Sequence, residues 1–141
     1  MSEEEFDRAV REDEFVEHVT YVSGQRYGTL RLEVERILAA GKSCILELET
    51  QGARAVRDTR RDAVTIFVQA PSFAELERRL RDRATESAGE IGERIELARH
   101  QMEEADDFDY VVTNDDLERA VGELEELVRR ALGAPGTITR A

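Results

Sequence analysis

The sequence is short of the residue types that would tie it to an oxidising or membrane environment. Its 141 residues contain one cysteine, Cys44, and no tryptophan. A single thiol cannot form an internal disulfide, which fits a reducing cytoplasm, so we expect a cytoplasmic protein. No hydrophobic run is long enough to cross a bilayer, and the acidic start Ser2–Glu5 is unlike a signal peptide. The composition therefore predicts a globular chain with no membrane partner.

Lysine is also nearly absent, since Lys42 is the only one. The formal net charge is −12, which argues against a nucleic-acid polymer or an anionic membrane as the main partner, because both select basic surfaces. Arginine supplies almost all of the positive charge, and its guanidinium fork suits bidentate contacts with phosphate. A local site for a small anion therefore stays open.

The apolar stretch Ser43–Glu49 reads as a buried strand of a parallel sheet. Side chains alternate along a strand, so Glu47 and Glu49 would project from the same face at its carboxyl end. Ligands bind at that end of parallel α/β sheets, and acids are out of place in a core. The alternative is that both glutamates mark the exit of the strand into solvent.

Strand and helix patterns alternate along the chain, which predicts a single α/β domain over residues 1–141 with three parallel strands and helices on the faces of the sheet. The first half is expected to contain a short helix opened by a Ser2/Glu5 capping box, a hairpin or excursion between Glu14 and Thr29, and a helix over Leu30–Ala40 closed by Gly41. The strand Ser43–Glu49 and a short helix within Gln51–Asp62 follow. The second half is expected to contain a strand over Ala63–Ala70, helices that begin at Ser72 and Ser87, a strand over Tyr110–Thr113 and a last helix capped by Asn114. Gly133–Ala141 is predicted to be a frayed tail.

Four short stretches follow one another along the chain: EFVEH at Glu14–His18, YGT at Tyr27–Thr29, ILELETQGA at Ile45–Ala53, and NDD at Asn114–Asp116, which comes after YVV at 110–112. Together with Pro71-Ser72 and Arg79-Leu80 they resemble the guanylate kinases, which transfer a phosphoryl group from ATP to GMP. The resemblance runs from about Ser2 to Leu132. It implies an α/β core like that of nucleoside-monophosphate kinases, with a GMP-binding excursion over residues 14–30 and a lid-like region over residues 79–94.

The resemblance also implies a role for each candidate site residue. Glu17 and Glu49 would read guanine, because a carboxylate accepts from its adjacent ring N–H and amine. Thr29 would offer its hydroxyl to the base, and Tyr27 would bond the GMP phosphate. The remaining residues belong to the donor side: Arg79, Arg83 and Arg94 resemble the arginines that clamp phosphates, Asn114 the residue beside the donor adenine, and Glu47 a carboxylate near the metal-bound phosphates, with Mg²⁺ entering with ATP.

Two substitutions depart from the family pattern. The second acid of the strand is usually aspartate, so Glu49 is one methylene longer and is expected to shift or weaken base binding. Arg83-Ala84-Thr85 stands where the family has Arg-Gly-Thr, and alanine disfavours positive φ, so the lid hinge should be stiffer.

A larger departure concerns the phosphate loop. Family members carry a strand and a glycine-rich loop ending in Lys-Ser/Thr, but the motif G-x-x-x-x-G-K-[ST] does not occur in these 141 residues. Without that backbone cradle the donor triphosphate loses most of its binding groups, so turnover by this chain alone should be very slow or zero. The core would then lack the first strand of the family's sheet.

Three hypotheses remain open at this point. The chain is a phosphotransferase whose donor site comes from elsewhere, a non-catalytic paralogue that binds GMP or a protein partner, or an N-terminally truncated guanylate kinase. In the family's sheet the phosphate-loop strand lies between the strands that correspond to Ser43–Glu49 and Ala63–Ala70. Its loss would leave these two apolar strands with facing unpaired edges, so either they close onto each other or a second chain fills the gap. We expect a homo-oligomer or a strand-exchanged dimer.

Overall fold

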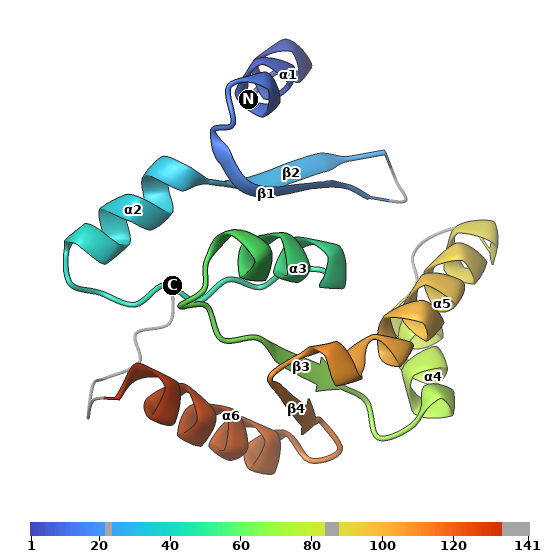
Figure 1. Ribbon diagram of the computed structural model, residues 1–141. Helices are drawn as coiled ribbons and strands as arrows, with labels where there is room; N and C mark the ends of the chain where they lie inside the picture. Colours follow the sequence, from blue (N-terminus) through green and yellow to red (C-terminus); the bar gives the residue numbers. More distant parts are fainter. Residues whose placement is uncertain (22–23, 84–87, 134–141) are drawn as a thin grey trace. The chain divides into compact units, whose positions relative to one another are not determined.

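The computed structural model describes residues 1–21, 24–83 and 88–133 and divides the chain into two compact units (Figure 1). The first unit comprises Met1–Ala63 and the second Val64–Ala141. Each is an assembly of short helices around a two-stranded sheet, and together they confirm the α/β class with a parallel sheet. The single-domain organisation over 1–141, with its 14–30 and 79–94 excursions, stays a prediction. Most of the tail predicted at 133–141 lies outside the described residues.

The first helix, α1 (Glu3–Arg11), begins as the sequence predicts. Ser2 Oγ accepts a hydrogen bond from the Glu5 amide at 3.2 Å, and Glu5 Oε2 accepts one from the Ser2 amide at 2.6 Å, which completes a capping box. The helix buries Phe6 and Ala9 against Phe15 of the next element, and the two phenyl rings lie 4.7 Å apart. This contact forms a small core on one face of the first sheet.

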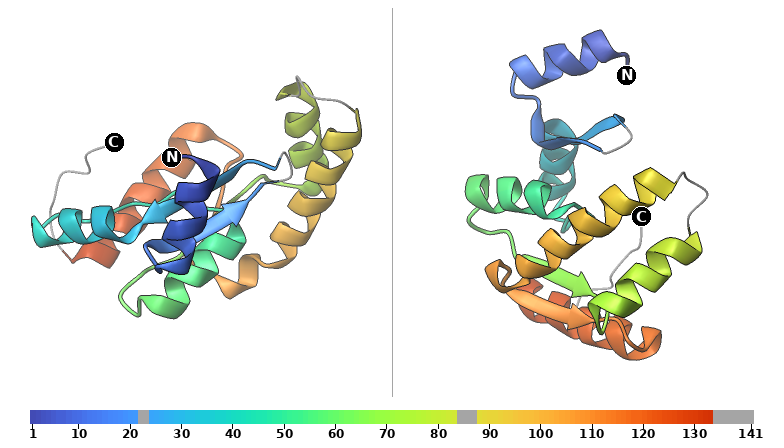
Figure 2. Two further views of the ribbon diagram at one scale, coloured as in Figure 1. Left: turned by 90° about the horizontal axis from the view of Figure 1, so that it is seen from above. Right: turned by 90° about the vertical axis from the view of Figure 1, so that its right-hand side faces the viewer.

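That sheet is the predicted hairpin, made by the antiparallel strands β1 (Phe15–Thr20) and β2 (Arg26–Leu30). Phe15 pairs with Leu30, but Glu17 pairs with Thr29, so β1 holds one extra residue and forms a bulge at this point. The bulge puts Phe15 on the face that α1 covers and Glu17 on the opposite face. Figure 2 shows α1 on one side of the hairpin and α3 on the other.

The hairpin leads into α2 (Arg31–Ala39), whose C-cap is Ala40. Gly41, which was predicted to close this helix, is the next residue and has the left-handed conformation expected there, with φ of 71°. The strand predicted over Ser43–Glu49 is absent, because this segment is neither helix nor strand among the described residues. A strand is defined by hydrogen bonds to a neighbouring strand, and the two described sheets leave this segment without one. Ile45 is accordingly 65% exposed, although the sequence predicted it to be buried. The segment delivers the chain to α3 (Thr50–Thr59), which packs against β1.

The second unit contains the parallel pair β3 (Ile66–Gln69) and β4 (Tyr110–Thr113). Before the two strands, Asp109 Oδ2 accepts hydrogen bonds from both the amide and the hydroxyl of Thr65, each at 2.8 Å. Thr65 is buried, so this carboxylate satisfies polar groups that have lost water. Two of the three predicted parallel strands are therefore present, joined in one sheet.

Between these strands the chain forms α4 (Phe73–Arg83), α5 (Ala88–Glu103) and the short 3-10 turn η1 (Ala105–Asp107). The helices α4 and α5 pack against each other, and α6 (Leu117–Leu132) packs against β4. The prediction that Asn114 caps the last helix is wrong, since Asp116 is the N-cap and accepts from the Arg119 amide at 2.9 Å. Asn114 instead extends the hydrogen bonding between β4 and β3, because its backbone N–H donates to the Gln69 backbone carbonyl oxygen at 2.7 Å.

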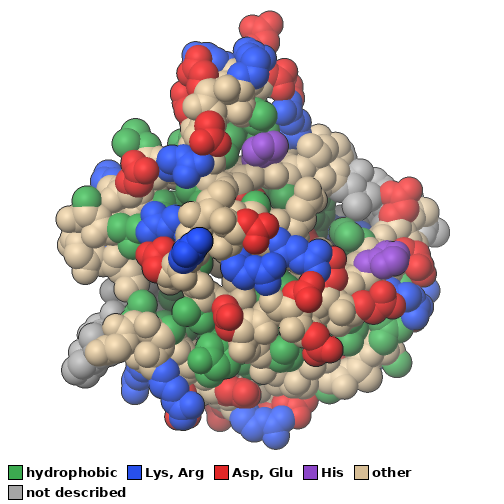
Figure 3. All heavy atoms as spheres, in the orientation of Figure 1, with side chains coloured by type: hydrophobic (Ala, Val, Ile, Leu, Met, Phe, Trp, Pro, Cys, Tyr) green, Lys and Arg blue, Asp and Glu red, His purple; other side chains and the backbone are tan. Residues whose placement is uncertain are grey.

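Over the face drawn in Figure 3, acidic and basic side chains are interleaved. Several of the described helices carry ion pairs between their own side chains, such as Arg78 with Glu75 and Asp82 on α4. Within the part of the chain that is described, none of the helices has both the length and the apolar character needed to span a membrane. The cytoplasmic localisation stays a prediction.

Candidate functional site

A cavity of about 320 Å³ lies on the face of the hairpin opposite α1. All of its lining residues belong to the first unit: Glu17, Val19, Tyr27, Gly28, Thr29, Glu47, Leu48 and Glu49. The four residues predicted to bind GMP are therefore gathered in one cavity, together with the glutamate predicted to lie near the metal-bound phosphates. They come from β1, β2 and the segment before α3, which the chain brings together by packing α3 on β1.

Glu17 is the buried member of this group, with 5% of its surface exposed. Its Oε1 accepts a hydrogen bond from the Thr29 hydroxyl at 2.7 Å across the hairpin. An ionised carboxylate only accepts, so the Thr29 proton must point to Glu17, and toward a ligand the hydroxyl oxygen can act as an acceptor. The structure gives Glu17 Oε2 no hydrogen-bond donor among the residues it describes.

Glu49 occupies the N-cap position of α3, where its carbonyl accepts from the Ala53 amide at 2.9 Å. Its side chain makes no capping hydrogen bond to the helix and lines the cavity instead. Glu47 also lines the cavity and is exposed. The strand predicted here is missing, yet the two acids still meet at one site, so their convergence does not depend on strand pairing.

The chemical character of the cavity follows from this lining. Three carboxylates and two hydroxyls, those of Thr29 and Tyr27, supply acceptors, Val19 and Leu48 supply an apolar wall, and no basic side chain lines the cavity among the described residues. Tyr27 stands at its edge with 45% of its surface exposed and its ring 5.7 Å from that of Tyr21. Such a cavity suits a flat, partly apolar ligand that presents several N–H donors.

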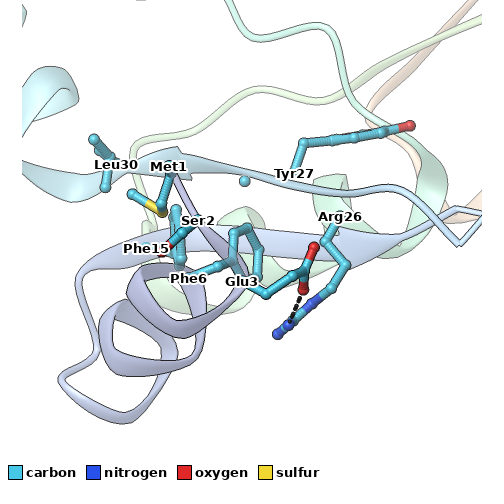
Figure 4. Close-up of a pocket in the computed structure, with 9 residues that line it drawn as sticks. Met1, Ser2, Glu3, Phe6, Phe15, Arg26, Tyr27 and Leu30 are labelled. Atoms are coloured by element: carbon cyan, nitrogen blue, oxygen red, sulfur yellow. Dashed lines mark hydrogen bonds and ion pairs between the residues drawn. The ribbon is translucent and has the colours of Figure 1, made fainter.

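A second cavity of about 300 Å³ lies on the α1 side of the same hairpin (Figure 4). Arg26 lines this cavity, donates to Glu3 at 3.0 Å and to Asp7 at 2.7 Å, and stands 4.3 Å from the Phe6 ring centroid. These two carboxylates raise the pKa of the Arg26 guanidinium. Arg26 and Tyr27 leave β2 in opposite directions, so only the cavity on the Glu17 side combines the predicted residues.

In the second unit, Arg79 and Asn114 are in direct contact. Arg79 Nη1 donates to the Asn114 carbonyl oxygen at 3.0 Å, and Arg79 Nε donates to Glu75 Oε1 at 2.7 Å. Hydrogen bonds from Arg78 and Arg79 hold the pKa of the Glu75 carboxyl at about 2, well below its usual 4.5. Arg79 is thus held at the end of β4, and three of its five N–H donors lie outside these two bonds.

The other predicted arginines are less fully placed. Arg94 lies on α5 and is half-buried, whereas the Arg83 side chain lies outside the described residues, as does Ala84-Thr85 of the predicted hinge. Within the described ranges, no group of three or more His, Cys, Asp or Glu side chains could hold a metal ion. The structure thus describes the surroundings of Arg79 most completely.

Sequence reasoning missed three residues that shape these sites. Gly28 and Leu48 line the first cavity, and Glu75 holds Arg79. Glu75 carried a signal, since it stands four residues before Arg79 on a predicted helix, a spacing at which opposite charges pair. Leu48 carried none, because an apolar residue in an apolar run reads as core.

Comparison with known proteins points to one family. The family model of guanylate kinase matches residues 1–131. The guanylate kinase of Rubrobacter xylanophilus is 50% identical over 130 residues, covering 92% of this chain and 68% of that protein. The guanylate kinase of Thermus thermophilus is 44% identical over 134 residues, covering 93% of this chain and 60% of that protein. A crystal structure of guanylate kinase from Anaplasma phagocytophilum superposes with a TM-score of 0.76 at 28% identity, covering 96% of this chain and 65% of that one.

The match spans nearly all of this chain but only part of each relative. In a Synechococcus guanylate kinase that is 44% identical over 125 residues, it covers 89% of this chain and 57% of that protein. The matched residues cover the first unit, most of the second unit and every predicted site residue. The chain belongs to the guanylate kinase family.

Proposed function

We propose that this chain binds GMP in the cavity lined by Glu17, Tyr27, Thr29 and Glu49, and so provides the acceptor side of phosphoryl transfer from ATP to GMP. The observation that carries the proposal is that one cavity gathers all four residues from three separate parts of the chain. Relatives described as guanylate kinases support the same substrate.

The acceptors of the cavity favour guanine over adenine. Guanine presents its ring N–H and exocyclic amine side by side, and the carboxylates of Glu17 and Glu49 with the Thr29 oxygen can accept from them. Adenine has an unprotonated ring nitrogen at the matching position, which would face a carboxylate without a proton between them. A site built from buried acceptors discriminates strongly against a ligand that lacks the donors, because the acceptors are then left unpaired.

The acidic lining also fixes the orientation of the nucleotide. The phosphate of GMP is repelled by the carboxylates, so it must point away from Glu17 and Glu49 toward the exposed edge at Tyr27, whose phenol can donate to it. This is the role that the sequence predicted for Tyr27.

On the donor side, we propose that Arg79, Arg83 and Arg94 neutralise charge on the transferring phosphate and that Asn114 lies beside the adenine. Glu47 would face the phosphates that bind Mg²⁺, an ion that neutralises charge on ATP. The motif of the glycine-rich phosphate loop does not occur in these 141 residues, so transfer requires a donor site from a partner chain, from rearranged arginines or from a longer form of this chain. The second candidate function is therefore GMP binding, or protein interaction, without catalysis.

Calorimetric titration of GMP tests the acceptor site. We expect binding by the parent chain, an affinity about tenfold or more weaker for Glu49→Ala, and no comparable loss for Asp106→Ala, an exposed acid in the second unit. The absence of GMP binding by the parent would overturn the proposal. ADP release with ATP and GMP, measured in a coupled assay, then separates the two functions: turnover equal to buffer leaves only the binder.

We also propose that the exposed edge of β3 is covered in a homo-oligomer or strand-exchanged dimer. Among the described residues β3 pairs only with β4. Val64, two residues before β3, is 44% exposed, and Val68, within β3, is 54% exposed. Light scattering at high micromolar concentration tests this, and a monodisperse monomer would contradict it.

A further inference from the structure

Gly52, the third residue of α3, lies against the carboxylate of Glu17. A Cβ built on Gly52 would stand 2.9 Å from Glu17 Oε2 and 3.4 Å from Glu17 Cδ, and 3.5 Å from Leu48 Cβ. Carbon and oxygen atoms that are not bonded do not approach to 2.9 Å without a shift of one of them. The space beside Glu17 therefore exists because position 52 has no side chain.

The backbone does not explain a glycine at this position. Gly52 lies within a helix, a conformation that any residue can adopt. By contrast, Gly24, Gly41 and Gly133 have positive φ, and a Cβ added to any of them would meet nothing within 4 Å. Glycine in a helix is also less favourable than alanine, because it loses more conformational freedom on folding. Helix formation alone would favour alanine here, so the glycine serves something other than α3.

We infer that Gly52 is a positioning residue for guanine recognition: it leaves the space that holds the Glu17 carboxylate in its base-reading orientation. One oxygen of this carboxylate is fixed by the Thr29 hydroxyl at 2.7 Å, and the other lies against Gly52. Two contacts on opposite sides fix both the position and the rotation of the group. This inference rests on the proposed GMP binding.

A methyl group at position 52 would push Glu17 by about half an ångström, the difference between 2.9 Å and an ordinary contact of 3.4 Å. The side chain is buried, so it has little room to yield without loosening its bond to Thr29. Binding sites lose function when a group leaves its productive position by about 0.5 Å. The base contact should therefore weaken while the hairpin and α3 stay folded.

The test compares Gly52→Ala with Gly122→Ala, a control within α6 where an added Cβ meets nothing within 4 Å. GMP and IMP are titrated into parent and variants by calorimetry, since IMP lacks the exocyclic amine. We expect Gly52→Ala to weaken GMP binding about tenfold or more and to reduce the preference for GMP over IMP, with no change for the control. An effect on folding alone would not change that preference.

A second measurement needs no ligand. In the parent, Gly52→Ala should lower the midpoint of thermal unfolding, because of the contact with Glu17. In a Glu17→Ala background it should raise the midpoint, because the contact is gone and only the gain in helix propensity remains.

The outcomes separate the two proposals. No GMP binding by the parent overturns the proposed function and this inference with it. Binding by the parent with unchanged affinity and selectivity in Gly52→Ala overturns the inference alone. The same effect of Gly52→Ala on thermal unfolding in both backgrounds would also overturn it.

Discussion

Replacing Thr29 with valine tests the hydrogen bond that holds the Glu17 carboxylate in the cavity. Valine keeps the branched shape and strand preference of threonine but removes the hydroxyl that donates to Glu17 Oε1 at 2.7 Å. Glu17 is 5% exposed, so its carboxylate has little water to replace the lost donor. A hydrogen bond to a charged group contributes about 1.5–3 kcal/mol, and we expect Thr29→Val to lower the free energy of unfolding by about 2 kcal/mol.

Urea unfolding followed by circular dichroism at neutral pH, without nucleotide, measures this difference. Thr29→Ser is the matched control, because it keeps the donor and removes only a methyl group, and we expect it to cost about 1 kcal/mol or less. Thermal unfolding should show a loss of about 4–8 °C for the valine variant. If Thr29→Val is as stable as Thr29→Ser, the bond contributes nothing and the argument fails.

Three further substitutions probe other parts of the structure. In urea unfolding, Gly28→Ala should lower the free energy of unfolding by about 2 kcal/mol, because the added Cβ would stand 2.6 Å from the Glu17 backbone carbonyl oxygen. Glu75→Gln should be less stable than the parent above pH 4.5, and the difference should shrink as the pH falls toward 2, since the Glu75 pKa is lowered to about 2 and the stability that its ionised form adds is lost on protonation. Asp109→Ala should cost about 1–3 kcal/mol by leaving the amide and hydroxyl of buried Thr65 without this acceptor, measured by thermal unfolding.

Each has a control and an outcome that contradicts it. Gly92→Ala adds its methyl group where nothing lies within 4 Å, and equal costs at positions 28 and 92 would contradict the steric argument. Glu77→Gln is the control, because it removes an exposed ion pair with Arg81. If the stability of Glu75→Gln falls with decreasing pH as steeply as that of the parent, the role of Glu75 is contradicted. Asp106→Ala removes an exposed acid, and an equal cost at position 109 would show that the two bonds to Thr65 add nothing.

Several features followed from local chemistry, and the sequence alone was enough to predict them. The Ser2/Glu5 capping box, the hairpin and the Gly41 cap depend on residues a few positions apart, and the structure confirms them. The family followed from the order of short motifs, and the comparisons confirm it. The motifs also named the residues that meet in the cavity, although their roles stay predictions.

Other features depend on which segments meet, and local patterns do not report this. Ser43–Glu49 has the composition of a buried strand, but the described residues give it no partner to pair with. Asn114 and Asp116 are both good caps, and the choice fell to Asp116 because the Asn114 amide bonds Gln69 in the sheet. The space beside Gly52 likewise depends on how α3 packs on β1.

The bulge in β1 lets two side chains at positions of the same parity lie on opposite faces of the hairpin. Phe15 and Glu17 are two positions apart and in a regular strand would share a face, yet the extra residue turns one into the core and the other into the cavity. Removing Val16 would remove the bulge, make Phe15 and Glu17 neighbours in a regular strand, and so keep them on opposite faces, with Glu17 still opposite Thr29. If β1 kept its present length but ran in regular register, Val16 would stand opposite Thr29, and Glu17 would lie on the same face as Phe15 and α1.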